Sequence, residues 1–339
     1  MKNLICILCF AVFFYSCEKS TSEPKEVELG SLQKILDGYI VRSIAFDSKG
    51  NAWIGTQGQG IIRYNSKETV FYNSENSIIS KDFFTWDIAV DKSDHVWIGG
   101  SGESGGLIKY DGKGLTLYNS KNTAMPLDHV KNVAVDSQNN VWFASCNINT
   151  GGIVKFDGTE WTVYTPDNSV LPYNLINSIA IDQSDNVWVA YHNQLIKISN
   201  NVWKVYSEKE LGFTPYNIGD IKINSKNCIV GAIDYYFSSA FDHSSNPSAF
   251  VFDDKNSASL FSGPLRGFGK VFVDHKDNIW FFGIFSDFAM LIGKQWKQIN
   301  FVKEYSVRSV WAMQEDADHR IWFGTEDGIY ISEKNPLNR

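Results

Sequence analysis

The sequence repeats one short pattern, an Asp followed six residues later by a Trp. Each Asp ends a segment in which apolar and polar residues alternate, as in Val41–Asp47, and each Trp lies in a short apolar run. A seventh copy is degenerate, because Asn224 and Val230 replace the pair. The copies recur with a period of about 40 to 50 residues, which is typical of β-propeller blades. The six intact pairs are Asp47 and Trp53, Asp91 and Trp97, Asp136 and Trp142, Asp182 and Trp188, Asp274 and Trp280, and Asp316 and Trp322.

Each copy divides into four short apolar segments, which predicts four antiparallel strands per blade. The Asp, Asn and Gly residues between the first two segments favour a tight hairpin turn. The last copy ends at Ile329–Ile331 without a fourth strand, whereas Val27–Leu36 precede the first copy without a blade of their own. We therefore expect an all-β fold, a single seven-bladed β-propeller over residues 27–339. Its N-terminal strand completes the last blade and closes the ring, so that no sheet edge is left exposed.

The N-terminus has the pattern of a targeting segment. Lys2 precedes an apolar run from Leu4 to Tyr15, which is too short to span a bilayer and has the length of a signal-peptide core. Ser16-Cys17 at its end resembles the lipobox of bacterial lipoproteins, although the alternative is an ordinary signal peptide with an incidental Cys. We expect a signal peptide over 1–16, a lipid on Cys17 and a polar tether over 17–26. The chain would then be held in the cell envelope by its acyl chains alone.

The composition narrows the classes of function. Charged residues make up 20% of the chain and hydrophobic residues 43%, as in a folded globular protein. The net charge of −7 argues against broad binding to nucleic acid, which needs a basic face. After the N-terminal segment no stretch is apolar and long enough to cross a membrane, and we expect a monomer without a cofactor.

Most of the 11 Trp residues have an architectural explanation. The six that follow an Asp recur too regularly to be a binding surface, and we expect them to fill the gaps between blades. Trp161, Trp203 and Trp296 fall in the outer strands. Trp86 and Trp311 remain, both at the second position of an innermost strand, where packing is the favoured explanation and exposure at the channel mouth is the alternative.

The repeat resembles the two-component regulator propeller family over residues 41–332. The resemblance rests on the linkers Tyr164–Pro172 and Tyr118–Pro126, and on the terminal copy from Glu315 to Thr325. It implies a propeller of the kind that forms the extracytoplasmic sensing part of hybrid sensor kinases, often in bacteria that use complex glycans. The sequence has no kinase region, so the resemblance implies recognition of a ligand or partner and not kinase activity.

A ligand site is expected at the channel mouth, on the face where the innermost strands begin. Exposed aromatic rings beside polar groups there would suit a polar ring or a peptide. One alternative is that these groups only solvate the channel. Another is that the insertion after Ala232 only compensates for the missing Trp of the degenerate blade. The candidate ligand-binding residues are Arg42, Trp86, Asp87, Lys131, Tyr173, His192, Tyr216, Asp220, Tyr235, Tyr236, Lys270 and Trp311.

Catalysis has little support in the sequence. His129, His192 and His243 fall on the loop face without metal-ligand spacing. The other three histidines fall in the hairpin turns of the opposite face, and we assign no catalytic or metal-binding residue. We expect a non-enzymatic module that recognises a glycan or an envelope protein. The alternative is a propeller lyase or hydrolase with its active site on the loop face.

Overall fold

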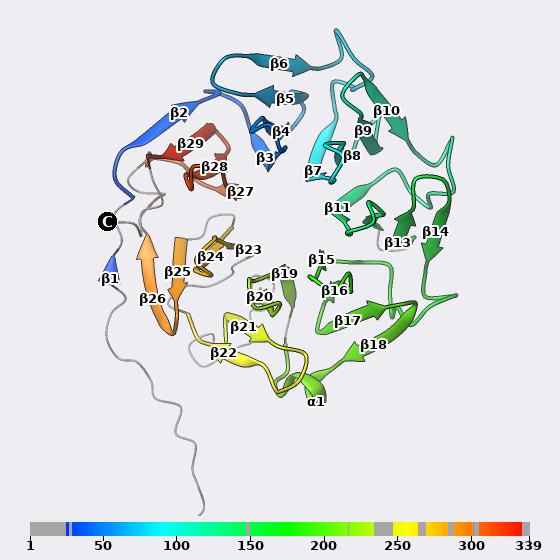
Figure 1. Ribbon diagram of the computed structural model, residues 1–339, viewed down its shortest axis with the longest axis vertical. Helices are drawn as coiled ribbons and strands as arrows, with labels where there is room; N and C mark the ends of the chain where they lie inside the picture. Colours follow the sequence, from blue (N-terminus) through cyan, green and yellow to red (C-terminus); the bar gives the residue numbers. More distant parts are fainter. Residues whose placement is uncertain are drawn as a thin grey trace, which may run out of the picture.

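The computed structural model describes residues 25–26, 29–146, 150–215, 217–233, 247–263, 269–283, 288–299, 301 and 305–333. These residues form seven sheets arranged as a ring about a central channel (Figure 1). Each blade has four antiparallel strands. The blades are numbered one to seven along the chain, starting from the first innermost strand. The expected seven-bladed propeller is therefore confirmed.

The innermost strands line the channel (Figure 1), and each is the first strand of its blade along the chain. They are β3 (Val41–Phe46), β7 (Phe84–Val90), β11 (Val130–Val135), β15 (Ser178–Ile181), β19 (Ile218–Ile223), β23 (Lys270–Val273) and β27 (Val310–Glu315).

The second strands carry the repeated Trp residues: β4 (Ala52–Thr56), β8 (Val96–Ser101), β12 (Val141–Cys146), β16 (Val187–Tyr191), β20 (Ile229–Ile233), β24 (Ile279–Phe282) and β28 (Ile321–Thr325). The third strands are β5 (Ile61–Tyr64), β9 (Gly106–Tyr110), β13 (Gly151–Phe156), β17 (Gln194–Ser199), β21 (Ala249–Phe252), β25 (Phe288–Ile292) and β29 (Gly328–Ser332). The outer strands of the first six blades are β6 (Thr69–Tyr72), β10 (Leu115–Tyr118), β14 (Trp161–Tyr164), β18 (Val202–Tyr206), β22 (Ser259–Phe261) and β26 (Gln295–Ile299).

The N-terminal segment closes the ring. Strand β2 (Leu32–Ile35) pairs antiparallel with β29 and is the outer strand of blade seven, as the sequence predicts. The Lys34 ammonium reinforces this pairing with an ion pair of 2.6 Å to Asp327. One further strand was not expected: β1 (Lys25–Glu26) adds to blade six, parallel to β26. A short helix, α1 (Glu208–Leu211), follows blade four.

The core consists of the layers between neighbouring blades. Trp53 of blade one is 1% exposed and lies 4.7 Å from the ring of Tyr110 in blade two. At the closing junction, Trp322 of blade seven lies 5.2 Å from Phe46 of blade one. The repeated Trp residues therefore fill the gaps between blades, as expected from their spacing.

The Asp of each pair organises the hairpin turn and also binds the indole. Asp47 Oδ1 accepts hydrogen bonds from the backbone N–H groups of Lys49 and Asn51, while Oδ2 accepts one from Trp53 Nε1 at 3.0 Å. The corresponding indole bonds in the other five pairs measure 2.8–3.1 Å. In blade five Asn224 still accepts the turn N–H groups of Lys226 and Cys228, and Val230 takes the place of the indole. The degenerate blade thus keeps its hairpin turn without the Asp–Trp bond.

Candidate functional site at the channel mouth

In five blades the innermost strand has an irregularity near its beginning, at the end of the strand that lies at the channel mouth. In five blades the pairing register shifts between the first and third residues, as between Val41 and Ser43 in blade one. A bulge leaves one residue outside the regular pairing and reorients its side chain. The residues in this position are Arg42, Trp86, Lys131, Gly219 and Trp311.

Arg42 is enclosed by aromatic rings from both neighbouring blades. Its guanidinium carbon lies 3.6 Å from the ring centroid of Trp311 in blade seven. On the other side it lies 4.5 Å from the centroid of Phe84 and 5.7 Å from that of Trp86, both in blade two. Cation–π attraction of this kind is worth about 0.5–2 kcal/mol, depending on desolvation. The rings therefore hold the guanidinium in one place without neutralising its charge.

The electrostatics of Arg42 favour an anionic ligand. Burial among the rings lowers the pKa of Arg42 to about 10, so the guanidinium remains protonated at neutral pH. Among the described residues, no carboxylate lies within ion-pair distance of it. The side chain is half-buried, so its N–H donors can still meet a molecule that enters from the mouth.

The aromatic wall continues into blades two and three. The ring of Trp86 lies 4.4 Å from that of Phe84, inclined by 36°, and its Nε1 donates a hydrogen bond of 3.0 Å to Ser101 Oγ. The ring of His129 lies 5.3 Å from that of Trp86, and burial lowers the pKa of His129. Within the described part of the chain, His129 Nε2 and Trp311 Nε1 are buried without a hydrogen-bond partner. These two atoms are polar groups that a ligand or water at the mouth could satisfy.

The opposite side of the mouth has smaller residues at the bulge position. Blades five and six have Gly219 and Gly269 at the position that Arg42 occupies in blade one. A Cβ placed on Gly269 would meet no atom of the described residues within 4 Å. The described part of the mouth therefore has bulky rings around a cation at this position in blades one, two and seven, and glycines in blades five and six.

Asp87 and Asp220 lie one residue deeper and join blades. Asp87 Oδ2 accepts the N–H of Val133 in blade three at 3.0 Å, and Oδ1 lies 3.4 Å from the Ser43 hydroxyl of blade one. Asp87 thus connects blades one, two and three. Asp220 repeats this arrangement in blades four, five and six. It accepts the Ser178 hydroxyl at 2.6 Å and the N–H of Val271 at 3.2 Å.

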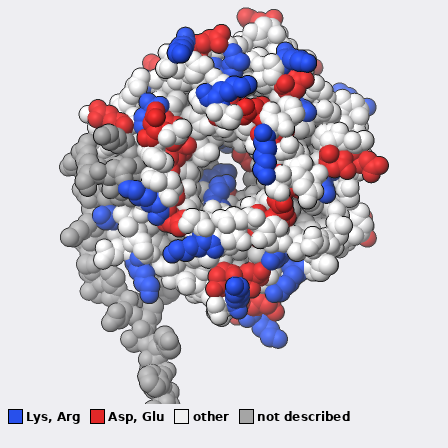
Figure 2. All heavy atoms as spheres, viewed as in Figure 1, with Lys and Arg blue, Asp and Glu red and all other residues white. Residues whose placement is uncertain are grey.

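The charges of Lys222 and Lys270 act on both carboxylates, but the net pKa shift differs in direction. Burial raises the pKa of Asp87. Burial also acts to raise the pKa of Asp220, but the charges of Lys222 and Lys270, together with the hydrogen bonds from Ser178 and Val271, outweigh it and the pKa is lowered. Lys222 lies 3.7 Å from Asp220, and this charge raises the pKa of the lysine. Charged atoms of both signs are visible inside the central hollow (Figure 2).

The structure thus brings three predicted residues, Arg42, Trp86 and Trp311, into one cluster and places Asp87, Asp220 and Lys270 below it. Tyr173 is 65% exposed and stacks on Tyr191 in blade four. Lys131 is half-buried in blade three, and His192 is exposed in blade four. Cys17, Tyr216, Tyr235 and Tyr236 fall outside the described residues.

Sequence reasoning missed several participants. Phe84 is the first residue of β7, two residues before Trp86, and His129 precedes β11 and reaches Trp86 only because blades two and three are neighbours in the ring. Lys222 has no counterpart in the other blades, since the equivalent residues include Ala45, Ala134 and Ala180. A charged residue at this position, which is Ala in four of the other blades, is the signal that could have identified it.

A further cluster lies on the opposite face, at the hairpin turns. His275, Glu315 and His319 have their ligand atoms within 4.8 Å of one another. The sequence placed both histidines in these turns but did not bring them together, because no local spacing connects them.

The comparisons with known proteins agree with this fold. Residues 35–58 and 304–327 match the family model described as two component regulator propeller. These segments contain the first and last Asp–Trp pairs, so the protein is a seven-bladed propeller that carries this family's repeat. No curated protein gives a significant match.

Solved structures share the propeller at low sequence identity. The extracellular domain of a one component system from B. thetaiotaomicron is 16% identical, with a TM-score of 0.69, over 90% of this chain and 40% of that chain. The extracellular domain of a hybrid two component system from the same organism is 19% identical, with a TM-score of 0.68, over 88% of this chain and 39% of that one. The present chain therefore spans about 40% of the length of these proteins.

An enzyme has the same fold. A catalytically inactive virginiamycin B lyase from Staphylococcus aureus, solved with quinupristin, is 14% identical, with a TM-score of 0.69, over 89% of this chain and 98% of that chain. At these identities the similarity concerns the fold alone. Within the described ranges, no helix combines the length and apolar character that crossing a bilayer requires.

Proposed function

We propose that the protein is a non-enzymatic recognition module outside the cytoplasm that binds a glycan carrying carboxylate groups at the channel mouth. In this proposal a lipid on Cys17 holds it in the bacterial cell envelope. The observation that carries the proposal is the position of Arg42 between Trp86 and Trp311, without a carboxylate partner among the described residues. The extracellular sensing propellers of similar fold support an extracytoplasmic location.

The chemistry of the mouth suits an acidic sugar. A guanidinium binds a carboxylate through two parallel hydrogen bonds, and it is the preferred cation where this planar geometry matters. Because Arg42 is held by rings on both sides, little side-chain freedom remains to be lost on binding. Trp86 and Trp311 also present apolar ring surface beside the charge, against which the apolar face of a sugar ring can pack.

Recognition accounts for this mouth better than catalysis does. The described groups around Arg42 are aromatic rings and a cation, and none is a nucleophile hydrogen-bonded to a base. The carboxylates below it are already engaged by backbone N–H groups of neighbouring blades. A lyase would instead need an acid or base within hydrogen-bond reach of its substrate.

The test is thermal unfolding of the purified protein with neutral oligosaccharides and with uronate oligosaccharides of equal length. A ligand at 100 times its dissociation constant adds about 2.7 kcal/mol to the free energy of unfolding. We expect stabilisation by the uronates only, lost in Arg42→Gln and weakened in Arg42→Lys, which keeps the charge but not the paired hydrogen bonds.

Arg63→Gln is the matched control, because Arg63 lies away from the channel and pairs with Glu68 at 3.0 Å. It should leave the stabilisation intact. Stabilisation that survives in Arg42→Gln would place the glycan elsewhere. No stabilisation by any uronate would contradict the proposal and redirect the search toward a protein partner.

A further inference from the structure

The hairpin turns of the opposite face connect neighbouring blades in a repeated way. The backbone N–H of the first turn residue donates to the side chain of the third turn residue in the next blade. Ser48 N–H, for example, donates to Asp94 Oδ1 at 2.9 Å. The third turn residue has a positive φ, near 60°, which Asp and Asn tolerate well. The same contact joins Lys92 to Asn139, Ser137 to Asp185, Gln183 to Asn227, and Ser225 to Asp277.

The junction between blades six and seven breaks this pattern at three positions at once. His275 is the first turn residue of blade six. The third turn residue of blade seven is His319, whereas in blades two to six the third turn residue is Asp or Asn. Glu315 replaces the apolar residue that ends the innermost strand of every other blade, such as Val273. The Glu315 carboxylate takes over the connection, because its Oε2 accepts the N–H of His275 at 2.8 Å.

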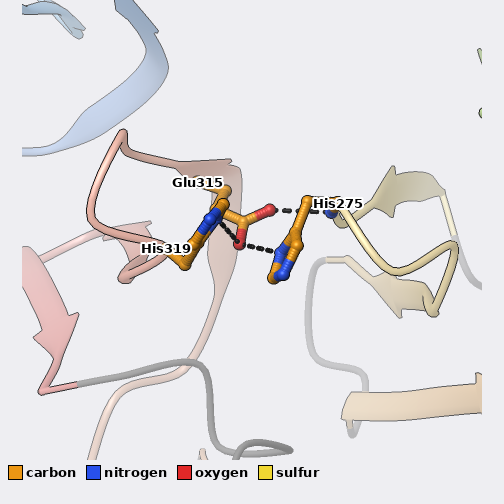
Figure 3. Close-up of side chains that lie close together, drawn as sticks. All are labelled: His275, Glu315 and His319. Atoms are coloured by element: carbon orange, nitrogen blue, oxygen red, sulfur yellow. Dashed lines mark hydrogen bonds and ion pairs between the residues drawn. The ribbon is translucent and has the colours of Figure 1, made fainter.

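The three side chains converge on one point (Figure 3). Glu315 Oε1 lies 2.5 Å from His275 Nδ1 and 3.2 Å from His319 Nδ1. The two imidazole rings stack with centroids 3.8 Å apart and planes inclined by 22°. The Glu315 side chain is only 10% exposed, whereas that of His319 is 52% exposed. The carboxylate is thus fixed by the fold, and the imidazoles can be reached from solvent.

We propose that His275 Nδ1, His319 Nδ1 and Glu315 Oε1 bind a divalent transition-metal ion of the Zn²⁺ type. Two imidazole nitrogens and one carboxylate oxygen are a common ligand set for Zn²⁺, with water completing the coordination. Binding would replace the present contacts of the imidazoles to Glu315 Oε1 by metal–ligand distances of about 2.0–2.2 Å, which requires the imidazoles to rotate. Nitrogen ligands disfavour Mg²⁺ and Ca²⁺, which prefer oxygen.

The ion would connect the two blades next to the ring closure. His275 belongs to blade six, whereas Glu315 and His319 belong to blade seven, which the N-terminal strand completes. A pocket of about 350 Å³, lined in part by Phe272, His275 and Glu315, adjoins the cluster and gives solvent access to the carboxylate. Since this site and Arg42 lie at opposite ends of the innermost strands, the metal site does not depend on the proposed glycan binding.

The test is calorimetric titration of the purified protein, prepared without a histidine tag, with Zn²⁺, Mg²⁺ and Ca²⁺, followed by thermal unfolding with each ion. We expect one Zn²⁺ per chain, a higher unfolding temperature with Zn²⁺, and no comparable effect of Mg²⁺ or Ca²⁺.

His319→Asn removes one ligand and restores the residue type that blades three and five use at this turn, so the variant should fold. It should lower the Zn²⁺ affinity by more than the 10- to 100-fold that loss of an outer-shell group costs. Glu315→Gln should also weaken binding while keeping an acceptor for the N–H of His275.

His95→Asn is the matched control. His95 lies in the turn of blade two, and Asn is the residue at this turn position in four other blades. This variant should bind Zn²⁺ like the unaltered protein. Equal Zn²⁺ affinity in His319→Asn, or equal stabilisation by Mg²⁺, would overturn the proposal.

Discussion

Trp188 donates a hydrogen bond of 2.9 Å from its indole Nε1 to Oδ2 of Asp182, six residues earlier in blade four. The same carboxylate accepts backbone N–H groups of Ser184 and Asn186 from its hairpin turn. One side chain therefore fixes the turn of its blade and the orientation of the ring that fills the gap to the next blade. This double use explains why the interval between Asp and Trp is constant in six blades.

Asp182→Asn should destabilise the protein by about 1–3 kcal/mol. The amide can keep the turn bonds through its oxygen, but its NH₂ group then faces the buried indole N–H, and that donor loses its acceptor. Urea unfolding at pH 7 measures the change. Asn224→Asp is the control in blade five, where Val230 offers no indole, and it should change stability little. Equal losses in both variants would contradict this explanation.

Asp220→Asn should cost more stability than Asp87→Asn at pH 7. Lys222 and Lys270 favour the ionised form of Asp220, so its neutralisation removes a favourable charge interaction, about 2 kcal/mol for a hydrogen-bonded charged group. Burial disfavours the ionised form of Asp87 more than the same two lysines favour it, and a neutral amide avoids that net penalty. The comparison uses unfolding midpoints of the two variants. A larger loss in Asp87→Asn would show that the channel charges are assigned incorrectly.

Stability should fall as the pH falls from about 4 toward 2. Hydrogen bonds from the N–H groups of Asn256 and Lys255 lower the pKa of Asp253 to about 2, and those from Ser137 lower the pKa of Asp185. A carboxyl whose pKa is lower in the folded state than the unfolded value of about 3.9 stabilises the fold above that value. This contribution is lost as the carboxyl is protonated. The raised pKa of Asp87 acts in the opposite direction.

Urea unfolding at pH 7, 4 and 3 measures this dependence. Asp253→Asn removes one of the groups with a lowered pKa, so the decline between pH 4 and 3 should become shallower. A stability that is the same at pH 4 and pH 3 would refute the expected role of these carboxylates.

A chain that begins at Tyr39 should be less stable than one that begins at Lys25, and it should associate. Removal of β2 uncovers the edge of β29, where Ile329 and Ile331 are 0% and 4% exposed. Unpaired strand edges with apolar residues promote association. Thermal unfolding and sedimentation at several protein concentrations test this. An unchanged unfolding temperature would mean that β2 contributes nothing to ring closure.

The sequence by itself determined the number of blades, the turns, the interblade Trp residues and the closure by an N-terminal strand. These follow from local patterns, because an Asp and a Trp six residues apart meet within one hairpin, and a missing fourth strand must be supplied by an unassigned segment. Strand β1 escaped prediction, since two residues carry no periodicity.

Only the tertiary structure decided which side chains share a site. Arg42 meets Trp86 and Trp311 because closing the ring brings blades two and seven to either side of blade one. His275 and Glu315 are separated by 40 residues, and they meet because equivalent turns of consecutive blades lie side by side. Such contacts depend on how blades are placed around the axis, and that placement is set by packing across the whole ring, which no single repeat encodes.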